Sequence, residues 1–184
     1  MKKDLFILGS PRSGKTTLAN QIGLRFNFNV ISGDALVDTF EQIFPEMKMW
    51  GHKNEKNIVP FFFQYMKNIK HHGPNRNLVI EGTDIWPKTA NAMLDKEKYR
   101  MVVIARPNLE PESFVVEIRK FEKPNDWTTK HDDADLLKQA EWFIKQAKQM
   151  RDEAIELGIH FMDTTGNRDA VLNDFMDNLD NFLS

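Results

Sequence analysis

The chain alternates short apolar runs with longer stretches in which apolar residues recur every three or four positions. Short apolar runs are typical of buried strands, whereas the three-to-four spacing is typical of amphipathic helices. The short runs predict strands at residues 5–8, 27–32, 77–82, 99–105 and 159–163.

The longer stretches predict helices between these strands. In one of them, Val59, Phe62, Met66 and Ile69 share one helical face. Glycines at 73 and 158 are expected to end two helices, and a proline at 111 suits a first helical turn. The predicted helices cover residues 15–26, much of 35–73, 106–124, 131–158 and 167–184.

This alternation of strands and helices predicts an α/β fold with a parallel sheet and helices on both faces. Right-handed crossovers place the ligand crevice of such a sheet at the carboxyl ends of its strands. Several polar residues and a glycine follow the predicted strand ends and are expected to line that edge, namely Gly9, Asp34, Glu81, Arg106 and Asp163.

The segment from Gly9 to Thr16, GSPRSGKT, matches the phosphate-loop pattern G-x-x-x-x-G-K-[ST] at every fixed position. Its backbone N–H groups and the N-terminus of the following helix would face the phosphates of a nucleoside triphosphate. Lys15 would reach the β and γ phosphates, and Thr16 would offer its hydroxyl to Mg²⁺. The alternative is a simple glycine turn with an exposed lysine. The residues predicted to bind nucleotide here are Gly9, Ser10, Pro11, Arg12, Ser13, Gly14, Lys15, Thr16 and Thr17.

Two carboxylates follow the second and third predicted strands. Asp34 is a candidate to orient or deprotonate an acceptor hydroxyl, and the alternative is that it caps a helix. Glu81 is a candidate to bind Mg²⁺ through water, and the alternative is an ion pair with Lys15 or a nearby arginine. Arg106, directly after the fourth strand, is a further phosphate candidate.

Composition narrows the function classes. The chain has 184 residues and a formal net charge of −2, so it gives no electrostatic case for nucleic-acid binding. It contains no cysteine, which excludes disulfides, thiolate metal sites and cysteine nucleophiles. The N-terminal apolar run is too short for a signal peptide, and no run approaches a membrane span. We therefore expect one cytoplasmic domain without a membrane partner.

Four segments together resemble the small P-loop kinases of the nucleoside-monophosphate-kinase type, the adenylate-kinase-like superfamily: GSPRSGKTT, VISGDALV, VIEGTDIWP and FVVEIRKFE. The resemblance implies a three-layer α/β/α P-loop fold with a five-stranded parallel sheet of order 2-3-1-4-5. It implies ATP and Mg²⁺ as cofactors, an acceptor-covering segment at about 35–73 and a lid at about 119–131. It also implies a catalytic phosphate contact for Arg119 and places Gly166 and Asn167 beside the adenine.

The chain departs from adenylate kinases where those enzymes bind the nucleoside monophosphate. No arginine follows the Gly33-Asp34 pair closely, and Trp86, Pro87 and Lys88 stand where adenylate kinases have Phe-Pro-Arg. These departures argue against AMP as acceptor. The stretch VIEGTDIWP is more similar to the matching strand of 2-phosphoglycerate kinases and zeta-toxin-like kinases.

Three functional hypotheses remain open. The first is an ATP-dependent kinase for a small molecule, in which Lys15 and Mg²⁺ act on the phosphates, Asp34 on the acceptor hydroxyl and Arg119 on the transferring group. The second is a nucleotide-binding ATPase or switch that transfers nothing to a small acceptor. The third is a kinase relative that only binds its ligand. The Asn-Lys-x-Asp motif expected of a GTPase does not occur.

Overall fold

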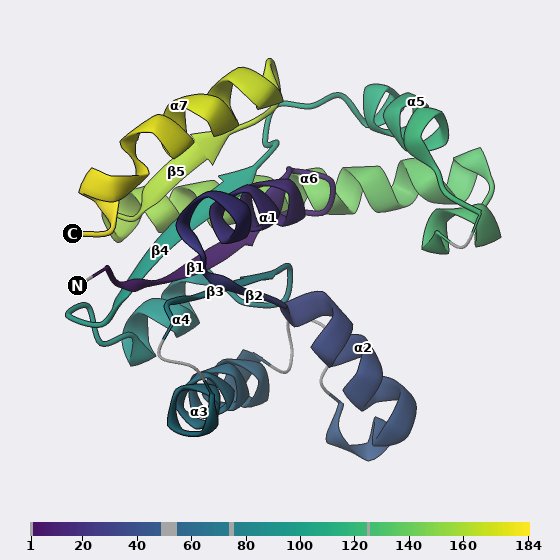
Figure 1. Ribbon diagram of the computed structural model, residues 1–184. Coiled ribbons are helices and arrows are strands. Elements are labelled where there is room, and N and C mark those ends of the chain that lie inside the picture. The colour runs from purple at the N-terminus through teal and green to yellow at the C-terminus, as the bar shows by residue number, and fades with distance from the viewer. Residues whose placement is uncertain (1, 49–54, 74–75, 125) are drawn as a thin grey trace.

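The computed structural model describes residues 2–48, 55–73, 76–124 and 126–184. A five-stranded sheet lies at its centre, with the strand order β2-β3-β1-β4-β5, and every pair is parallel (Figure 1). The strands are β1 (Asp4–Gly9), β2 (Asn29–Ser32), β3 (Leu78–Gly82), β4 (Tyr99–Ala105) and β5 (His160–Asp163). The α/β class and the strand order implied by the resemblance are both confirmed.

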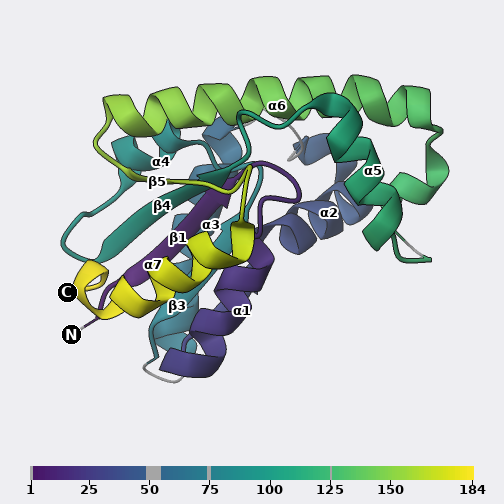
Figure 2. The ribbon, with the colours of Figure 1, turned by 90° about the horizontal axis from the view of Figure 1, so that it is seen from above.

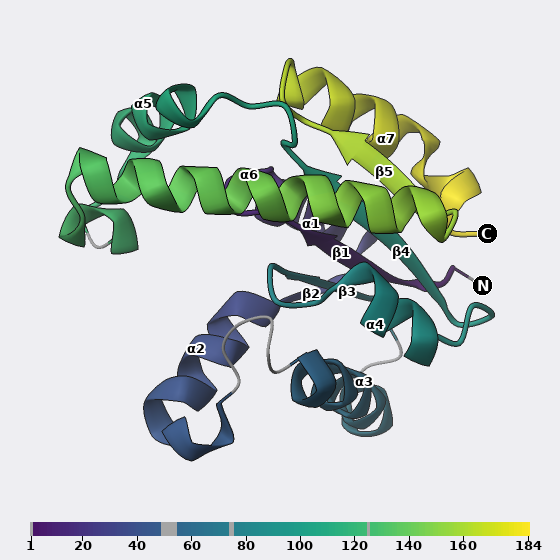
Figure 3. The same cartoon turned by 180° about the vertical axis from the view of Figure 1, so that it is seen from behind.

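Helices cover both faces of the sheet, with α1 and α7 on one side and α3, α4 and α6 on the other (Figures 2 and 3). The helices and 3₁₀ turns are α1 (Lys15–Phe26), α2 (Gly33–Ile43), η1 (Pro45–Met47), α3 (Glu55–His72), α4 (Pro87–Met93), α5 (Pro111–Phe121), η3 (Trp127–Lys130), α6 (Asp133–Glu156) and α7 (Arg168–Phe182). Among the described residues, no helix is both long and apolar enough to cross a bilayer.

The central strand divides its side chains between two cores. Phe6 and Leu8 face the layer that contains α3 and α6, whereas Leu5 and Ile7 face α1 and α7, and all four are fully buried. This follows from the period-two alternation of side chains along a strand. A strand that is apolar on both faces can only be central, which is where β1 lies.

The two halves of the long helix α6 pack against different parts of the molecule. Its C-terminal half packs on the sheet through Met150 and Ala154. Its N-terminal half extends past the sheet and packs against α5, where Phe114, Ile118 and Leu136 form a separate small core. This projecting unit, residues 111–140, contains the segment predicted as a lid at about 119–131; we call the whole unit the lid, and its closure over a ligand stays a prediction (Figures 1 and 3).

Most predicted elements agree with the structure to within a few residues, and the differences are local. The prediction gave no element for residues 83–98, where α4 begins with Pro87 as its first residue. The region expected to be largely helical at 35–73 contains α2, η1 and α3, and its residues 49–54 lie outside the described part of the chain. The second strand begins later than predicted because Asn27, the residue after α1, has a left-handed conformation with a φ of 58° instead of an extended one.

Candidate functional site

The segment between β1 and α1 has the backbone shape that a phosphate loop requires. Gly9 and Gly14 have φ angles of 152° and 107°, which L side chains rarely adopt. A Cβ on Gly9 would lie 1.7 Å from the Ile104 carbonyl oxygen, so no other residue fits there. Lys15 is the first residue of α1 and is only 5% exposed, and its Nζ donates a hydrogen bond of 3.0 Å to the Ser10 carbonyl. The segment therefore forms a curled loop, and the Lys15 side chain folds back over this loop.

A buried threonine after β5 supports this loop. The Thr164 hydroxyl donates to the Ser13 carbonyl at 2.9 Å, and its residue is fully buried. The Ser13 hydroxyl is also buried and has no hydrogen-bond partner among the described residues. A loop with a buried hydroxyl that lacks a hydrogen-bond partner fits a phosphate ligand.

Glu81 lies at the end of β3, beside Ser32 of β2 and Ile7 of β1 in the strand register. It is only 2% exposed. Burial raises the pKa of its carboxyl above the ordinary value, the Asp34 carboxylate adds to the rise, and the Lys15 ammonium opposes it. No ion pair with Lys15 is formed among the described residues, so the simple ion-pair alternative for Glu81 is not supported.

The surroundings of Glu81 fit a bound cation. Its Oε2 atom is buried and has no hydrogen-bond partner among the described residues. The hydroxyls of Ser32 and Thr16 lie close enough to favour the charged form of the carboxyl. A carboxylate oxygen and a threonine hydroxyl are oxygen ligands of the kind that Mg²⁺ takes alongside phosphates and waters.

Asp34 lies in the first turn of α2 and is held by the loop after β3. Its Oδ1 accepts the Thr83 backbone N–H at 2.7 Å, and its Oδ2 accepts the Thr83 hydroxyl at 3.3 Å. The helix cap is Ser32, whose hydroxyl accepts the Ala35 N–H, so the alternative that Asp34 caps the helix is wrong. Gly33 permits the close approach, because a Cβ there would lie 2.8 Å from the Glu81 carbonyl oxygen. Asp34 and Glu81 thus share one corner of the sheet edge with Lys15.

Three of the arginines near this edge, Arg12, Arg106 and Arg119, have carboxylate partners. Arg12, in the phosphate loop, pairs with Asp126 of the lid. The Arg106 Nη2 donates to Glu117 Oε1 at 2.8 Å, and this bonding holds the pKa of the Glu117 carboxyl below its ordinary value.

Arg119 bonds within the lid rather than to the phosphate loop. Its Nε donates to Asp133 at 2.8 Å, its Nη1 to Glu122 at 3.0 Å and its Nη2 to the His131 carbonyl at 2.7 Å. The predicted phosphate contact of Arg119 therefore stays a prediction, and it would require these bonds to be exchanged.

A cavity of about 210 Å³ lies between α5 and the start of α7. Gly166 and Asn167, which are predicted to flank a nucleotide base, both line it. The Asn167 side chain also caps α7 by accepting the Ala170 N–H. The cavity wall includes Arg106, whose buried Nε has no partner among the described residues. The lining residues are Arg106, Glu117, Phe121, Gly166, Asn167, Arg168 and Asp169.

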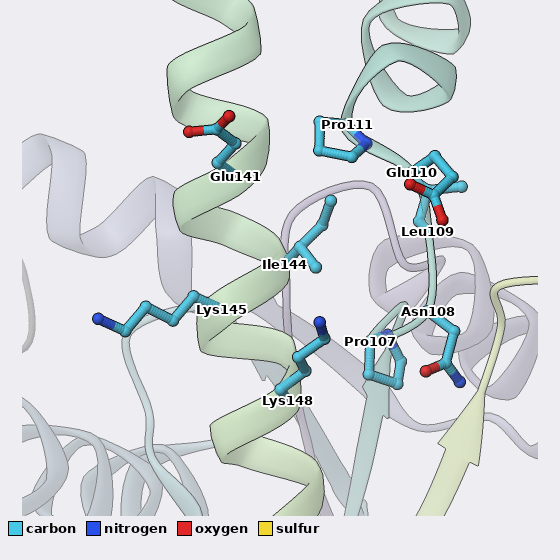
Figure 4. A pocket seen from close by; sticks show the side chains of 9 residues that line it. All are labelled: Pro107, Asn108, Leu109, Glu110, Pro111, Glu141, Ile144, Lys145 and Lys148. Carbon is cyan, nitrogen blue, oxygen red and sulfur yellow. The ribbon is translucent and has the colours of Figure 1, made fainter.

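A larger cavity of about 490 Å³ lies between the link from β4 to α5 and the middle of α6 (Figure 4). Lys148 points toward the link, whereas Lys145 points away from it (Figure 4). No residue of the phosphate loop lines it, and neither do Asp34 and Glu81. This cavity therefore lies between the two arms of the lid at their base, away from the phosphate loop, Asp34 and Glu81.

Comparisons with known proteins agree with this geometry at the level of the fold. No family model matches the sequence, and no curated protein matches it. The structure resembles a shikimate kinase from Bacteroides thetaiotaomicron, with a TM-score of 0.63 and 14% identity over 98% of this chain and 99% of that chain. It also resembles a sugar kinase from Janibacter sp. HTCC2649, with a TM-score of 0.59 and 14% identity over 98% of this chain and 95% of that chain. The chain therefore shares the fold of these two kinases, an α/β fold with a five-stranded parallel sheet.

Two residues that position other residues of the site were not predicted from the sequence. Thr83 orients Asp34, and Thr164 holds the Ser13 carbonyl. Each threonine comes directly after a strand end, and that position was the only signal available in the sequence. Thr17 lies on the exposed side of α1, whereas Pro11 is half-buried in the loop.

Proposed function

We propose that the protein is an ATP-dependent small-molecule kinase that transfers the γ-phosphate of Mg-ATP to an acceptor hydroxyl. The observation that carries the proposal is the convergence of a phosphate loop, an oriented carboxylate and a buried carboxylate at one sheet edge. A binding module would need the loop alone, whereas transfer to an acceptor also needs a group that handles the acceptor proton.

The nucleotide would lie along the phosphate loop. Lys15 and the N-terminus of α1 would neutralise the phosphate charge, and the base would enter the cavity beside Asn167 and Arg106. Thr16 and Glu81 would hold Mg²⁺, which supplies charge neutralisation on the phosphate oxygens.

Asp34 would act on the acceptor. Its Oδ2 receives only the longer of the two Thr83 bonds, so this oxygen is the better placed to accept the acceptor proton. The acceptor oxygen then forms a bond to the γ-phosphorus as the bond to the ADP oxygen breaks. Residues of α2 and α3 would cover the acceptor, and Arg119 would reach the transferring group from the lid.

The decisive experiment measures ADP formation from Mg-ATP with a panel of hydroxyl and phosphate acceptors, beside a Lys15→Ala control. Turnover that depends on one acceptor class supports the kinase. Turnover without any acceptor favours the ATPase alternative, and nucleotide binding without turnover favours the binding module. Failure of ATP to bind the wild-type protein at millimolar concentration would contradict both the kinase and the ATPase.

A further inference from the structure

We propose that Arg12 is a positioning residue that fastens the lid to the phosphate loop through Asp126. The two residues lie 114 positions apart in the chain and form an ion pair with the Arg12 side chain 32% exposed and that of Asp126 13% exposed. The part of the proposal that concerns nucleotide rests on the proposed function, whereas the fastening itself does not.

The backbone of the phosphate loop does not explain why position 12 is an arginine. Arg12 has a φ of 60°, a conformation that favours glycine over residues with a Cβ. Glycine would satisfy the loop without this strain. The long side chain therefore needs a reason beyond the loop's shape, and its contact with Asp126 of the lid supplies one.

On the lid side, Asp126 is held by its own backbone. Its N–H donates to the Lys123 carbonyl at 2.9 Å, and its carbonyl accepts the Thr129 N–H at 3.1 Å and the Thr129 hydroxyl at 2.8 Å. Its carboxylate is much less exposed than that of Asp133, which is 74% exposed on the same lid. A fixed, shielded carboxylate holds a guanidinium better than a mobile surface acid does.

The same turn also holds Arg119. The Arg119 Nη1 donates to the Thr128 carbonyl at 3.4 Å, and its Nη2 donates to the His131 carbonyl at 2.7 Å. A continuous set of bonds therefore runs from the phosphate loop through Arg12 and Asp126 to the turn that orients Arg119. Moving Asp126 moves the partners of the lid arginine.

The base of the lid contains a cavity. The cavity of about 490 Å³ separates the link to α5 from α6 where the two arms meet the body (Figure 4). The cavity leaves room for the two arms of the lid to move. The Arg12–Asp126 ion pair therefore determines how long the lid stays in contact with the phosphate loop. Breaking the Arg12–Asp126 pair should speed lid opening and shorten the residence of a nucleotide beneath it.

The test compares Arg12→Gly, Asp126→Asn, the double variant and Asp152→Asn. The last is a matched control, since Asp152 pairs with Arg151 on exposed α6 surface. Hydrogen exchange reports on the amides of residues 126–131 without any ligand. Dissociation of a fluorescent ADP, N-methylanthraniloyl-ADP, reports on residence. We expect each single variant to exchange and to release the probe about three- to fivefold faster, in line with one partly shielded ion pair.

The double variant should be no faster than either single variant, because one pair is lost in all three. Arg12→Gly should also keep or raise the unfolding temperature while it loosens the lid, since glycine relieves the positive φ. Unchanged exchange in either single variant, or additive effects in the double variant, would overturn the proposal. If the probe does not bind the wild-type protein, the proposed function fails and the exchange measurement still decides the fastening.

Discussion

Thr83 donates two hydrogen bonds to the Asp34 carboxylate, one from its backbone N–H at 2.7 Å and one from its hydroxyl at 3.3 Å. The two residues are 49 positions apart and come from the ends of adjacent strands. Without this contact, Asp34 would be an ordinary residue of the first turn of α2. The two bonds from Thr83 fix the orientation of its carboxylate. It is the feature that most favours transfer over simple nucleotide binding.

Asp34→Asn should lower kcat with the cognate acceptor by about 10²–10⁴-fold, because the amide cannot take the acceptor proton. The nucleotide Kd should change little, since the phosphate loop stays intact. Isothermal titration with ADP and steady-state kinetics check the two halves. A variant that keeps the wild-type kcat would remove Asp34 from the proton transfer.

Thr83→Val should keep the backbone bond to Asp34 and lose the hydroxyl bond. We expect kcat to fall by about threefold to tenfold with little change in KM for ATP, as for the loss of one orienting hydrogen bond. Thr83→Ser restores the hydroxyl and should recover most of the rate. Equal losses in the valine and serine variants would point to packing rather than to orientation.

Glu81→Gln should stabilise the protein at neutral pH. Burial raises the pKa of the Glu81 carboxyl above 4.5, so the folded chain binds more protons than the unfolded chain as pH rises past that value. The wild-type stability contributed by this group therefore falls with rising pH, and the amide does not titrate. Thermal unfolding of both proteins between pH 4 and pH 8, without nucleotide or divalent cation, should show a gap that widens with pH. A constant gap would contradict the raised pKa.

Gly9→Ala should destabilise the fold severely, because its Cβ would lie 1.7 Å from the Ile104 carbonyl oxygen and the backbone has a φ of 152°. We expect a loss of more than about 3 kcal/mol in the free energy of unfolding, or failure to fold. Gly166→Ala is the matched control, since nothing lies within 4 Å of its added Cβ, and its effect should stay within about 1 kcal/mol. Urea unfolding compares the two.

Thr164→Val should weaken nucleotide binding although Thr164 touches no phosphate in our proposal. Its hydroxyl holds the Ser13 carbonyl at 2.9 Å, and loss of one buried hydrogen bond costs about 1 kcal/mol. We expect a few-fold rise in the Kd for ADP and a small fall in unfolding temperature. Thr164→Ser keeps the donor and should behave as the wild type, and a valine variant with unchanged affinity would show that the loop does not need this support.

The local pattern of the sequence was enough to predict most elements, because strands and helices bury their apolar faces with different periods. It was enough to place β4 and α1 at their observed bounds. It did not predict α4, a short helix whose Pro87 start is no stronger a signal than an ordinary turn. The strand order came from the resemblance rather than from the periodicity, since periodicity does not say which strands are neighbours.

The candidate site shows the same division. The spacing of glycine, lysine and threonine by itself determined the phosphate loop, because curled backbone and a helix start leave few other residue choices. Only the tertiary structure decided that Thr83 holds Asp34 and that Arg12 reaches Asp126 in the lid. Each of these contacts joins residues whose proximity depends on how the strands are ordered or how the lid folds over the loop. Side-chain partners of that kind leave no periodic trace along the chain, so they can be found only when the chain is folded.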